Sequence, residues 1–390
     1  MLIDIIAGAR PNFMKIAPII KEMERVNRES ELEKESDKFL EYRLIHTGQH
    51  YDRNMSGAFF EQLGIPEPHM NLESGSGTQS EQTGRIMTRY EEVLKDRLST
   101  LCIVVGDVTS TMACSITAKK MGVRVAHVEG GIRSRDWTMP EEINRVATDS
   151  ITDYFFTTSE IANKNLRSEG VDGDRIFFVG NTMIDTLLGN LGKLRKPPMY
   201  DEKSLKEGRY FVMTLHRPAN VDEEHKLKEL IDNIAEGVGS EKIVFPVHPR
   251  TKKILDDLGI AHKNIIYTEP LGYLEFIYLI KHARAVITDS GGITEETTVL
   301  GIPCLTLRDN TERPETVTEG TNELIGTNPE AVKPALNHLM SGNWKKGTTP
   351  QKWDGKTSVR IVEKIQKLYD SGGLDRHKPF VDRNLMLEKH

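Results

Sequence analysis

The sequence predicts an α/β protein built from two doubly wound, Rossmann-like halves of comparable size. Short runs of apolar and β-branched residues alternate with longer helical patterns along the chain, which is typical of βαβ units in a parallel sheet. The alternation breaks over residues 193–208, KLRKPPMYDEKSLKEG, where two prolines and mixed charge favour a linker. With 390 residues, the chain is long enough for two domains that each bury a core.

The predicted strands are short, apolar runs bounded by polar residues or glycine. Before the linker they are Leu2–Ala7, Tyr42–Thr47, Leu101–Gly106, Arg124–Glu129, Tyr154–Thr157 and Arg175–Gly180. After it they are Arg209–Leu215, Lys242–Val247, Ile265–Thr268, Ala285–Asp289 and Pro303–Leu307. Helical patterns fill the gaps between them, including Thr78–Lys95, Ser110–Met121, Glu223–Val238 and Ile293–Leu300.

These patterns divide the chain into an N-terminal domain at 1–192, the linker at 193–208 and a C-terminal domain at 209–356. A last helix, Thr357–Asp370, and a tail complete residues 357–390, and we expect this helix to pack back onto the N-terminal domain. The segment Glu24–Asp37 is dense in Glu, Lys and Ser, which is typical of a solvated helix end or loop.

Composition excludes several classes of protein. The formal net charge is −6 and no segment is strongly basic, which argues against nucleic-acid binding. No run approaches the roughly eighteen apolar residues of a membrane helix. The first residues, MLIDII, place an acid in an apolar run without a basic lead, so we expect no signal peptide and a cytoplasmic protein. Three cysteines without a close pair argue against a disulfide framework or a structural zinc site.

Ligands of open α/β sheets collect at the carboxyl ends of the strands, and ionisable residues follow several of the predicted strands. Arg10 and Lys15 come after the first strand, where two cations beside a helix start suit a phosphate. A tight turn with solvated charges explains them equally well. Asp107, Glu129 and His216 follow other strands, which directs attention to a cleft between the halves.

Two further groups of ionisable residues lie near predicted strand ends. His248, in His-Pro-Arg, follows one strand of the second half. The pair Glu141 and Glu142 precedes Arg145, and the spacing of Glu141 and Arg145 is that of a surface salt bridge on a helix.

The sequence Asp289-Ser290-Gly291-Gly292 ends a strand and opens a helix. Its two glycines let the backbone approach a ligand, and the free amides of a helix start favour an anion. Glu295 and Glu296 are expected in the first turn, where they either offset the helix dipole or accept hydrogen bonds from ribose hydroxyls. A plain capping turn accounts for the Ser-Gly-Gly motif about equally well.

Missing motifs narrow the chemistry further. No strand is followed by G-x-G-x-x-G, and the P-loop and G-x-S-x-G motifs are absent, so no nicotinamide cofactor or other cofactor is expected. His46 and His50 have the spacing of a metal pair but do not lie along a helix, so no metal is expected. The residues alone indicate a two-domain α/β protein that binds an anionic, nucleotide-linked ligand between its halves.

The motifs together, in order from about Met1 to Tyr369, resemble the non-hydrolysing UDP-N-acetylglucosamine 2-epimerases. The matching motifs are Gly8-x-Arg10-Pro11 with Lys15, Thr47-Gly-Gln49-His50, Gly106-Asp107, His127-Val-Glu129-Gly-Gly, Pro140-Glu141-Glu142-x-Asn144-Arg145, Gly180-Asn181-Thr182-x-Ile184-Asp185, His216-Arg217, Pro246-Val-His248, Thr288-Asp-Ser290-Gly291-Gly292-x-x-Glu295-Glu296 and Arg308-Asp-x-Thr311-Glu-Arg313-Pro314-Glu315.

The resemblance implies a glycosyltransferase-B-like fold, a homodimer, and UDP, UDP-GlcNAc and UDP-ManNAc as ligands. It places the catalytic acids at Asp107, Glu129 and Glu141, and it assigns a catalytic role to His216, with His248 as a further candidate. It assigns nucleotide and substrate contacts to Arg10, Lys15, His216, His248, Phe276, Ser290, Gly291, Gly292, Glu296 and Arg313. Gln49 and His50 match part of an allosteric site found in some members, although Asp52 stands where a second Gln is usual.

The implied reaction is reversible inversion at C2 of UDP-GlcNAc, for surface polysaccharide or glycoconjugate synthesis. The C2 proton has no adjacent carbonyl, so the reaction first eliminates UDP to a glycal and then adds it back with protonation on the other face. Three alternatives stay open: a glycosyltransferase of similar fold, hydrolysis to ManNAc and UDP, and a nucleotide-sugar sensor without turnover. Asn12 departs from the Glu that is usual in the family, and Leu271 replaces a polar residue near the base.

Overall fold

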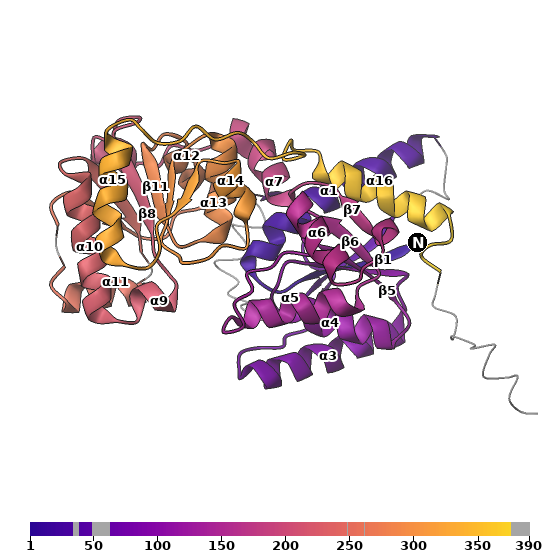
Figure 1. Cartoon of the computed structure of the whole chain (residues 1–390). Helices are drawn as coiled ribbons and strands as arrows, with labels where there is room; N and C mark the ends of the chain where they lie inside the picture. Colours follow the sequence, from indigo (N-terminus) through magenta and orange to yellow (C-terminus); the bar gives the residue numbers. More distant parts are fainter. Residues whose placement is uncertain (34–38, 49–62, 248, 261, 376–390) are drawn as a thin grey trace, which may run out of the picture.

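The computed structural model describes residues 1–33, 39–48, 63–247, 249–260 and 262–375. Two parallel sheets, each flanked by helices, lie side by side (Figure 1). We call the part that carries the first sheet the first half and the part that carries the second sheet the second half. The predicted fold class, two doubly wound α/β halves, is confirmed.

The first half has a seven-stranded parallel sheet in the order β3-β2-β1-β4-β5-β6-β7. Its strands are β1 (Leu2–Ala7), β2 (Glu41–His46), β3 (Met70–Asn71), β4 (Leu101–Val105), β5 (Arg124–Val128), β6 (Tyr154–Thr157) and β7 (Ile176–Phe178). Its helices are α1 (Arg10–Glu33), α3 (Gln79–Asp96), α4 (Thr109–Lys120), α5 (Pro140–Ile151), α6 (Glu160–Ser168), η2 (Gly173–Arg175), α7 (Thr182–Asn190) and η3 (Leu191–Lys193), and α8 (Met199–Glu202) lies between the two sheets in sequence.

The second half has a six-stranded parallel sheet in the order β10-β9-β8-β11-β12-β13. Its strands are β8 (Tyr210–Thr214), β9 (Lys242–Pro246), β10 (Ile265–Thr268), β11 (Ala285–Thr288), β12 (Cys304–Thr306) and β13 (Asn322–Leu324). The helices that follow β8 are α9 (Pro218–Val221), α10 (Glu224–Val238), α11 (Pro249–Asp257), α12 (Tyr273–Lys281), α13 (Gly291–Leu300), α14 (Pro314–Thr318), η4 (Pro329–Ala331), α15 (Val332–Met340) and α16 (Thr357–Asp370).

In each sheet, the direction in which successive strands are added changes next to the strand that comes first in the sequence. Such a switch point opens a crevice at the carboxyl ends of the strands. In the first half the switch lies between β1 and β4, and in the second half between β8 and β11. The predicted site residues follow these strands or their neighbours. The two switch points therefore decide which ionisable side chains can meet.

The predicted strands are confirmed in type, and most of their ends agree within two residues. Two short strands, β3 and β13, were not predicted, because their sequences, Met-Asn and Asn-Glu-Leu, contain no apolar run. The α13 helix begins at Gly291, two residues earlier than the apolar pattern indicates, because the pattern starts only at Ile293.

The predicted linker is packed against the second half. Residues 193–208 contain α8, and Tyr200 and Leu205 are both buried. The Tyr200 ring makes edge-on contacts with the rings of Tyr210 and Tyr278. Two buried side chains, Tyr200 and Leu205, fix this segment without the apolar periodicity that a longer helix would show.

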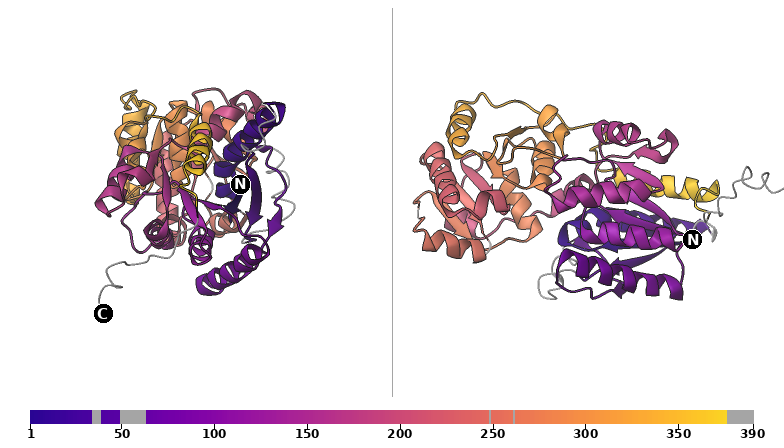
Figure 2. Two further views of the ribbon diagram at one scale, coloured as in Figure 1. Left: turned by 90° about the vertical axis from the view of Figure 1, so that its right-hand side faces the viewer. Right: turned by 60° about the horizontal axis from the view of Figure 1, so that its bottom comes forward.

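The chain returns to the first half before α16 begins. Trp353 is buried, and its indole Nε1 donates a hydrogen bond to the carbonyl of Thr158 at 3.0 Å. The Asp185 carboxylate of α7 then accepts hydrogen bonds from the backbone amides of Thr357 and Ser358, which caps α16. Figures 1 and 2 show α16 lying along the first half, beside α1. The exact domain boundaries stay a prediction.

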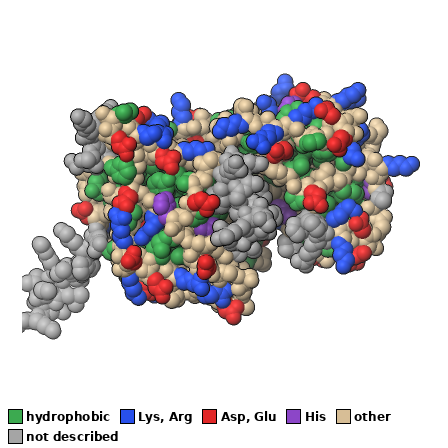
Figure 3. All heavy atoms as spheres, turned by 180° about the vertical axis from the view of Figure 1, so that it is seen from behind, with side chains coloured by type: hydrophobic (Ala, Val, Ile, Leu, Met, Phe, Trp, Pro, Cys, Tyr) green, Lys and Arg blue, Asp and Glu red, His purple; other side chains and the backbone are tan. Residues whose placement is uncertain are grey.

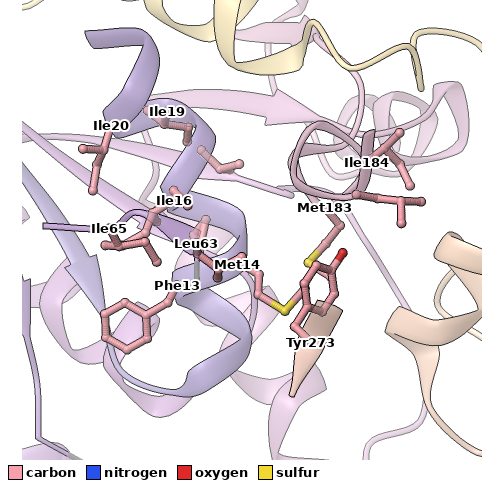
Figure 4. Close-up of a cluster of buried hydrophobic side chains, with 14 of the residues drawn as sticks. Phe13, Met14, Ile16, Ile19, Ile20, Leu63, Ile65, Met183, Ile184 and Tyr273 are labelled. Atoms are coloured by element: carbon pink, nitrogen blue, oxygen red, sulfur yellow. The ribbon is translucent and has the colours of Figure 1, made fainter. Parts of the chain in front are cut away.

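Apolar packing continues from one half into the other. Figure 4 shows Met14 of α1 and Met183 of α7 pointing towards the ring of Tyr273, which belongs to α12. All three side chains are buried. This contact fixes the second half against the helix that carries Lys15.

The outer surface carries charges of both signs. Basic and acidic side chains are interspersed over the face in Figure 3, in keeping with the near-balanced composition. Within the described ranges, no helix combines the length and the apolar character needed to cross a membrane.

Candidate active site

Lys15 and Glu129 meet at the carboxyl edge of the first sheet. Lys15 lies in the second turn of α1, which follows β1, and Glu129 comes directly after β5. The Lys15 Nζ lies 2.7 Å from Oε2 of Glu129, and both side chains are largely buried. Arg10 begins α1, but its side chain lies outside the described part of the structure.

Asn12 connects the ends of β1 and β4 by hydrogen bonds. Its Oδ1 accepts hydrogen bonds from the amides of Gly8 and Ala9, and its Nδ2 donates one to the carbonyl of Val105 at 3.1 Å. A carboxylate could accept the first two bonds but could not donate the third. Asn12 is therefore a neutral bridge between the two strands that a carboxylate could not replace.

Glu129 is held in an unusual conformation and in its ionised form. Its backbone has φ +73°, the left-handed region, which is uncommon for a residue with a side chain. Burial alone would raise the pKa of Glu129, but the charges of Lys15 and Arg313 outweigh it and lower the pKa. Its second oxygen, Oε1, is buried without a hydrogen-bond partner among the described residues, so it can accept a proton or a hydrogen bond.

Asp107 follows β4 and forms an ion pair with Arg145 of α5. Its removal from solvent opposes ionisation, but the charges of Arg145, Lys15 and Arg313 lower its pKa overall. Arg145 also contacts the buried carboxylate of Glu142 at 2.7 Å. The salt bridge suggested between Glu141 and Arg145 is therefore wrong, because Arg145 turns towards its i−3 neighbour and the site.

Glu141 lies at the beginning of α5 and is exposed. Its neighbour Glu142 is buried and accepts hydrogen bonds from the backbone amides of Ser134 and Arg135. Glu142 thus fixes the loop that connects β5 to α5. The buried, anchoring acid is the one that sequence reasoning did not select.

In the second half, Asp289 organises the loop after β8. This fully buried carboxylate accepts hydrogen bonds from the amides of His216 and Arg217, and its Oδ1 lies 2.6 Å from Nδ1 of His216. Burial alone would raise the pKa of Asp289, but His216 and these amides lower it. The His216 side chain is 61% exposed, so its other ring nitrogen can reach a ligand.

The beginning of α13 can receive an anion. Ser290 is the N-cap residue of the helix, but its side chain makes no capping hydrogen bond. A side chain built on Gly292 would point into open space, whereas one on Gly291 would collide with Glu312. The first-turn amides are therefore without a side-chain cap, as an anion-binding helix start requires.

Glu295 and Glu296 do not offset the helix dipole, because the helix begins at Gly291 and both lie in its second turn. Glu295 forms an ion pair with Nε of Arg313. Glu296 accepts a hydrogen bond from the Tyr273 hydroxyl at 3.0 Å, and burial raises its pKa to about 8. Phe276 lies on the same helix as Tyr273 and is half-buried.

Arg313 connects the two halves. Its Nη2 lies 3.0 Å from Oε2 of Glu129, across 184 residues of sequence, while its Nε holds Glu295. Glu129 therefore lies between a lysine of the first half and an arginine of the second. This cluster is the point at which the predicted catalytic and nucleotide-binding residues meet.

Three predicted site residues lie outside the described part of the structure, namely Gln49, His50 and His248. Five others that the structure places in the site were not selected from the sequence: Glu142, Arg145, Asp289, Arg308 and Glu312. Each belongs to a quoted motif. All but Asp289 also fit an ordinary i, i+3 or i, i+4 surface pair, so their role in the site could not be recognised.

The fold and this cluster define a class of protein: a glycosyltransferase-B-like α/β protein with two parallel sheets, in which Arg313 joins the ionised Glu129 of the first half to Glu295 of α13. Comparison with known proteins is more specific. A family model described as UDP-N-acetylglucosamine 2-epimerase matches residues 31–366. The chain belongs to this family.

Named relatives cover almost the whole chain. The UDP-N-acetylglucosamine 2-epimerase of Methanocaldococcus jannaschii is 42% identical over 93% of this chain and 98% of its own length. The UDP-2,3-diacetamido-2,3-dideoxy-D-glucuronate 2-epimerase of Pseudomonas aeruginosa is 35% identical over 94% of this chain and 100% of its own. A crystal structure of the M. jannaschii UDP-GlcNAc 2-epimerase in complex with UDP-GlcNAc and UDP matches with a TM-score of 0.80 at 42% identity, covering 93% of this chain and all of that one.

Proposed function

We propose that this protein is a non-hydrolysing UDP-N-acetylglucosamine 2-epimerase, an isomerase that interconverts UDP-GlcNAc and UDP-ManNAc. The observation that carries the proposal is the position of Glu129, ionised and held between Lys15 of the first half and Arg313 of the second. The two named relatives share UDP and epimerisation at C2 but differ in the sugar. The nucleotide and the reacting carbon are therefore the best supported parts of the proposal.

The reaction proceeds by elimination and re-addition. The C1–O bond breaks with its electron pair leaving on UDP, and a carboxylate takes the C2 proton, which gives the glycal and UDP. Re-addition of UDP at C1 with protonation of C2 on the opposite face gives the epimer. No oxidant enters the balance, which agrees with the absence of a nicotinamide-binding motif from the sequence.

The site residues have two tasks: some transfer the C2 proton, and others stabilise the departing diphosphate. Asp107 and Glu129, whose pKa values are lowered, are ionised at neutral pH and so are free to receive the C2 proton, and Glu141 is the third acid assigned to the reaction. Lys15, His216 and Arg313 stabilise the departing diphosphate together with the α13 amides, since cations and oriented amides stabilise charge that develops on a leaving group. Phe276 lies beside the uracil and Glu296 beside the ribose.

Proton NMR of the purified protein with UDP-GlcNAc in heavy water tests the proposal. We expect UDP-ManNAc to appear, with deuterium at C2 of the product, because the proton removed exchanges with solvent before re-addition. Product without deuterium would contradict proton loss to a solvent-exchanging base.

The other outcomes of this experiment correspond to the alternative functions. Free ManNAc and UDP would indicate the hydrolysing reaction. An unchanged substrate, with UDP still raising the melting temperature, would indicate a sensor or a transferase that needs an acceptor. A glycosyltransferase would then transfer the sugar once an acceptor is supplied.

The remaining parts of the proposal rest on the resemblance to the family and on expectations from the sequence. They are a homodimer, a cytoplasmic location and a second UDP-GlcNAc site that includes Gln49 and His50. Sedimentation equilibrium tests the dimer, and a sigmoidal dependence of rate on UDP-GlcNAc concentration would support the second site.

A further inference from the structure

The start of α13 faces a carboxylate that belongs to the chain itself. A Cβ built on Gly291 would lie 2.7 Å from Oε1 of Glu312 and 3.5 Å from Nη1 of Arg308. The other oxygen of Glu312, Oε2, accepts a hydrogen bond from Nη2 of Arg308 at 2.6 Å. Glu312 therefore lies at the same helix start to which the proposed function assigns the diphosphate.

Cations surround this carboxylate. Burial alone would raise the pKa of Glu312, but the charges of Arg308, Arg313 and Arg145 lower it to about 2. Burial and the charge of Arg308 lower the pKa of Arg217, and the charge of Glu312 offsets part of this effect. Glu312 is thus a permanent anion at neutral pH, and arginines from both halves act on it.

The same arginines keep hydrogen-bonding capacity for a larger anion. The side chain of Arg308 is only 4% exposed, and its Nη1 has no hydrogen-bond partner within the described ranges. Nη1 of Arg313 is buried and unpartnered in the same way. A buried guanidinium donor without an acceptor is costly, and a diphosphate has more oxygens than a carboxylate with which to satisfy it.

We propose that Glu312 is an internal competitor for the diphosphate subsite, and that the nucleotide binds by displacing its carboxylate from Arg308 and from the start of α13. This inference rests on the proposed function for the position of UDP. Its consequence is a limited affinity for UDP, because each binding event breaks a buried ion pair. Arg308 is then a diphosphate ligand, and Glu312 is the residue that sets the strength of binding.

Isothermal titration of UDP into the Glu312→Gln variant tests the inference. Glutamine keeps the size of the side chain but removes its charge, so we expect the Kd for UDP to fall roughly tenfold, the value of one charge-assisted hydrogen bond. Glu319→Gln is the matched control, since Glu319 is exposed in the same half and loses the same charge. Its Kd for UDP should stay within about twofold of the parent value.

Uridine separates a local effect from a general one. Uridine lacks the phosphates, so its affinity should be the same in Glu312→Gln and in the parent protein. A parallel gain for uridine and UDP would contradict the inference, because it would indicate a change in the whole second half. Unchanged or weaker UDP binding in Glu312→Gln would also overturn it.

Arg308→Gln completes a double-mutant cycle. This variant should bind UDP more weakly, and adding Glu312→Gln to it should restore little affinity, because the two residues act through one ion pair. If Glu312→Gln lowers the melting temperature, Glu312→Ala provides a second variant with the same expected gain for UDP. Stability lost in both variants without tighter UDP binding would make Glu312 a structural residue only.

Binding is measured independently of turnover, so the two proposals fail separately. Absence of epimerisation with the expected affinities would leave the internal competitor standing and overturn the proposed function. Normal epimerisation by the parent protein, with unchanged UDP affinity in Glu312→Gln, would support the proposed function and overturn the internal competitor.

Discussion

Glu129 is a single carboxylate on which both halves act. Lys15 approaches it from the first half and Arg313 from the second, and its backbone is held at φ +73°. Local strain of this kind persists only where the surrounding contacts determine it, and such residues cluster at active sites. The residue following β5 is therefore positioned by contacts far from it in sequence.

Glu129→Gln should abolish turnover while UDP still binds. The amide cannot accept the C2 proton, and loss of a general base lowers rates by roughly 10²–10⁴-fold. Steady-state kinetics and UDP titration check the two parts separately. Glu160→Gln, an exposed acid at the start of α6, is the control and should leave both unchanged. Normal turnover by Glu129→Gln would remove Glu129 from the catalytic groups.

Glu296 makes stability depend on pH. Burial raises its pKa from 4.5 to about 8, so the folded protein keeps a proton that the unfolded chain releases. Stability is then complete below pH 4.5 and falls as the pH rises to 8, by up to about 1.4 kcal/mol per pH unit.

Urea unfolding between pH 5 and 8 should therefore show a shallower decline for Glu296→Gln than for the parent protein. Glu315, whose pKa burial raises to about 7, leaves a residual slope in the variant. Glu330→Gln, at an exposed acid, should retain the parent slope. Equal slopes for parent and Glu296→Gln would show that Glu296 is ionised in the folded protein.

At the scale of elements, the loop after β5 depends on close backbone packing. Gly131 has φ +81°, and a Cβ there would lie 2.6 Å from the carbonyl oxygen of Ala162 on α6. Gly170 has a similar φ of +87°, but its Cβ would meet nothing within 4 Å. The two glycines therefore share the backbone strain and differ only in the collision.

Gly131→Ala and Gly170→Ala use this difference as an internal control. Gly170→Ala should lower the free energy of unfolding by about 1–2 kcal/mol, the cost of a left-handed alanine. Gly131→Ala should cost about 1–3 kcal/mol more, because α6 must move, and should also reduce turnover through the displaced Glu129. Denaturant unfolding and kinetics measure both effects. Equal costs at the two positions would mean that the loop relaxes freely.

At the scale of the whole molecule, the chain connects the two halves twice, through residues 193–208 and through the segment that ends in α16. Trp353 anchors the second connection, with 1% exposure and a hydrogen bond to Thr158 of the first half. The pair Glu129–Arg313 and the contact of Tyr273 with Met14 add direct links. The relative position of the halves is thus fixed by packing on both sides of the site.

Trp353→Ala should lower the free energy of unfolding by about 3–5 kcal/mol, the cost of removing a buried aromatic side chain. It should also separate the calorimetric transitions of the two halves, since the anchor between them is lost. Trp137→Ala, at a side chain 64% exposed, should change stability by no more than about 0.5 kcal/mol. A single, unshifted transition in Trp353→Ala would contradict this role.

The sequence by itself determined the alternation of strands and helices, the break near 193–208 and the order of the motifs. These features are local: the side-chain period of a strand or helix and the residues that end it lie within one stretch of chain. The helix Thr357–Asp370 was predicted at its observed bounds for this reason. The short strands β3 and β13 were missed because polar residues leave them without an apolar run.

Tertiary structure alone decided which charges meet. Arg145 had three acids within reach of a plausible pair, and only the packing of α5 against α4 and β5 selected Glu142 and Asp107 over Glu141. Arg313 pairs with Glu129 across 184 residues, and Glu312 lies against Gly291 at a different helix. Such pairings depend on the relative position of whole elements, which no local pattern records, whereas the residue types that make them possible were visible from the start.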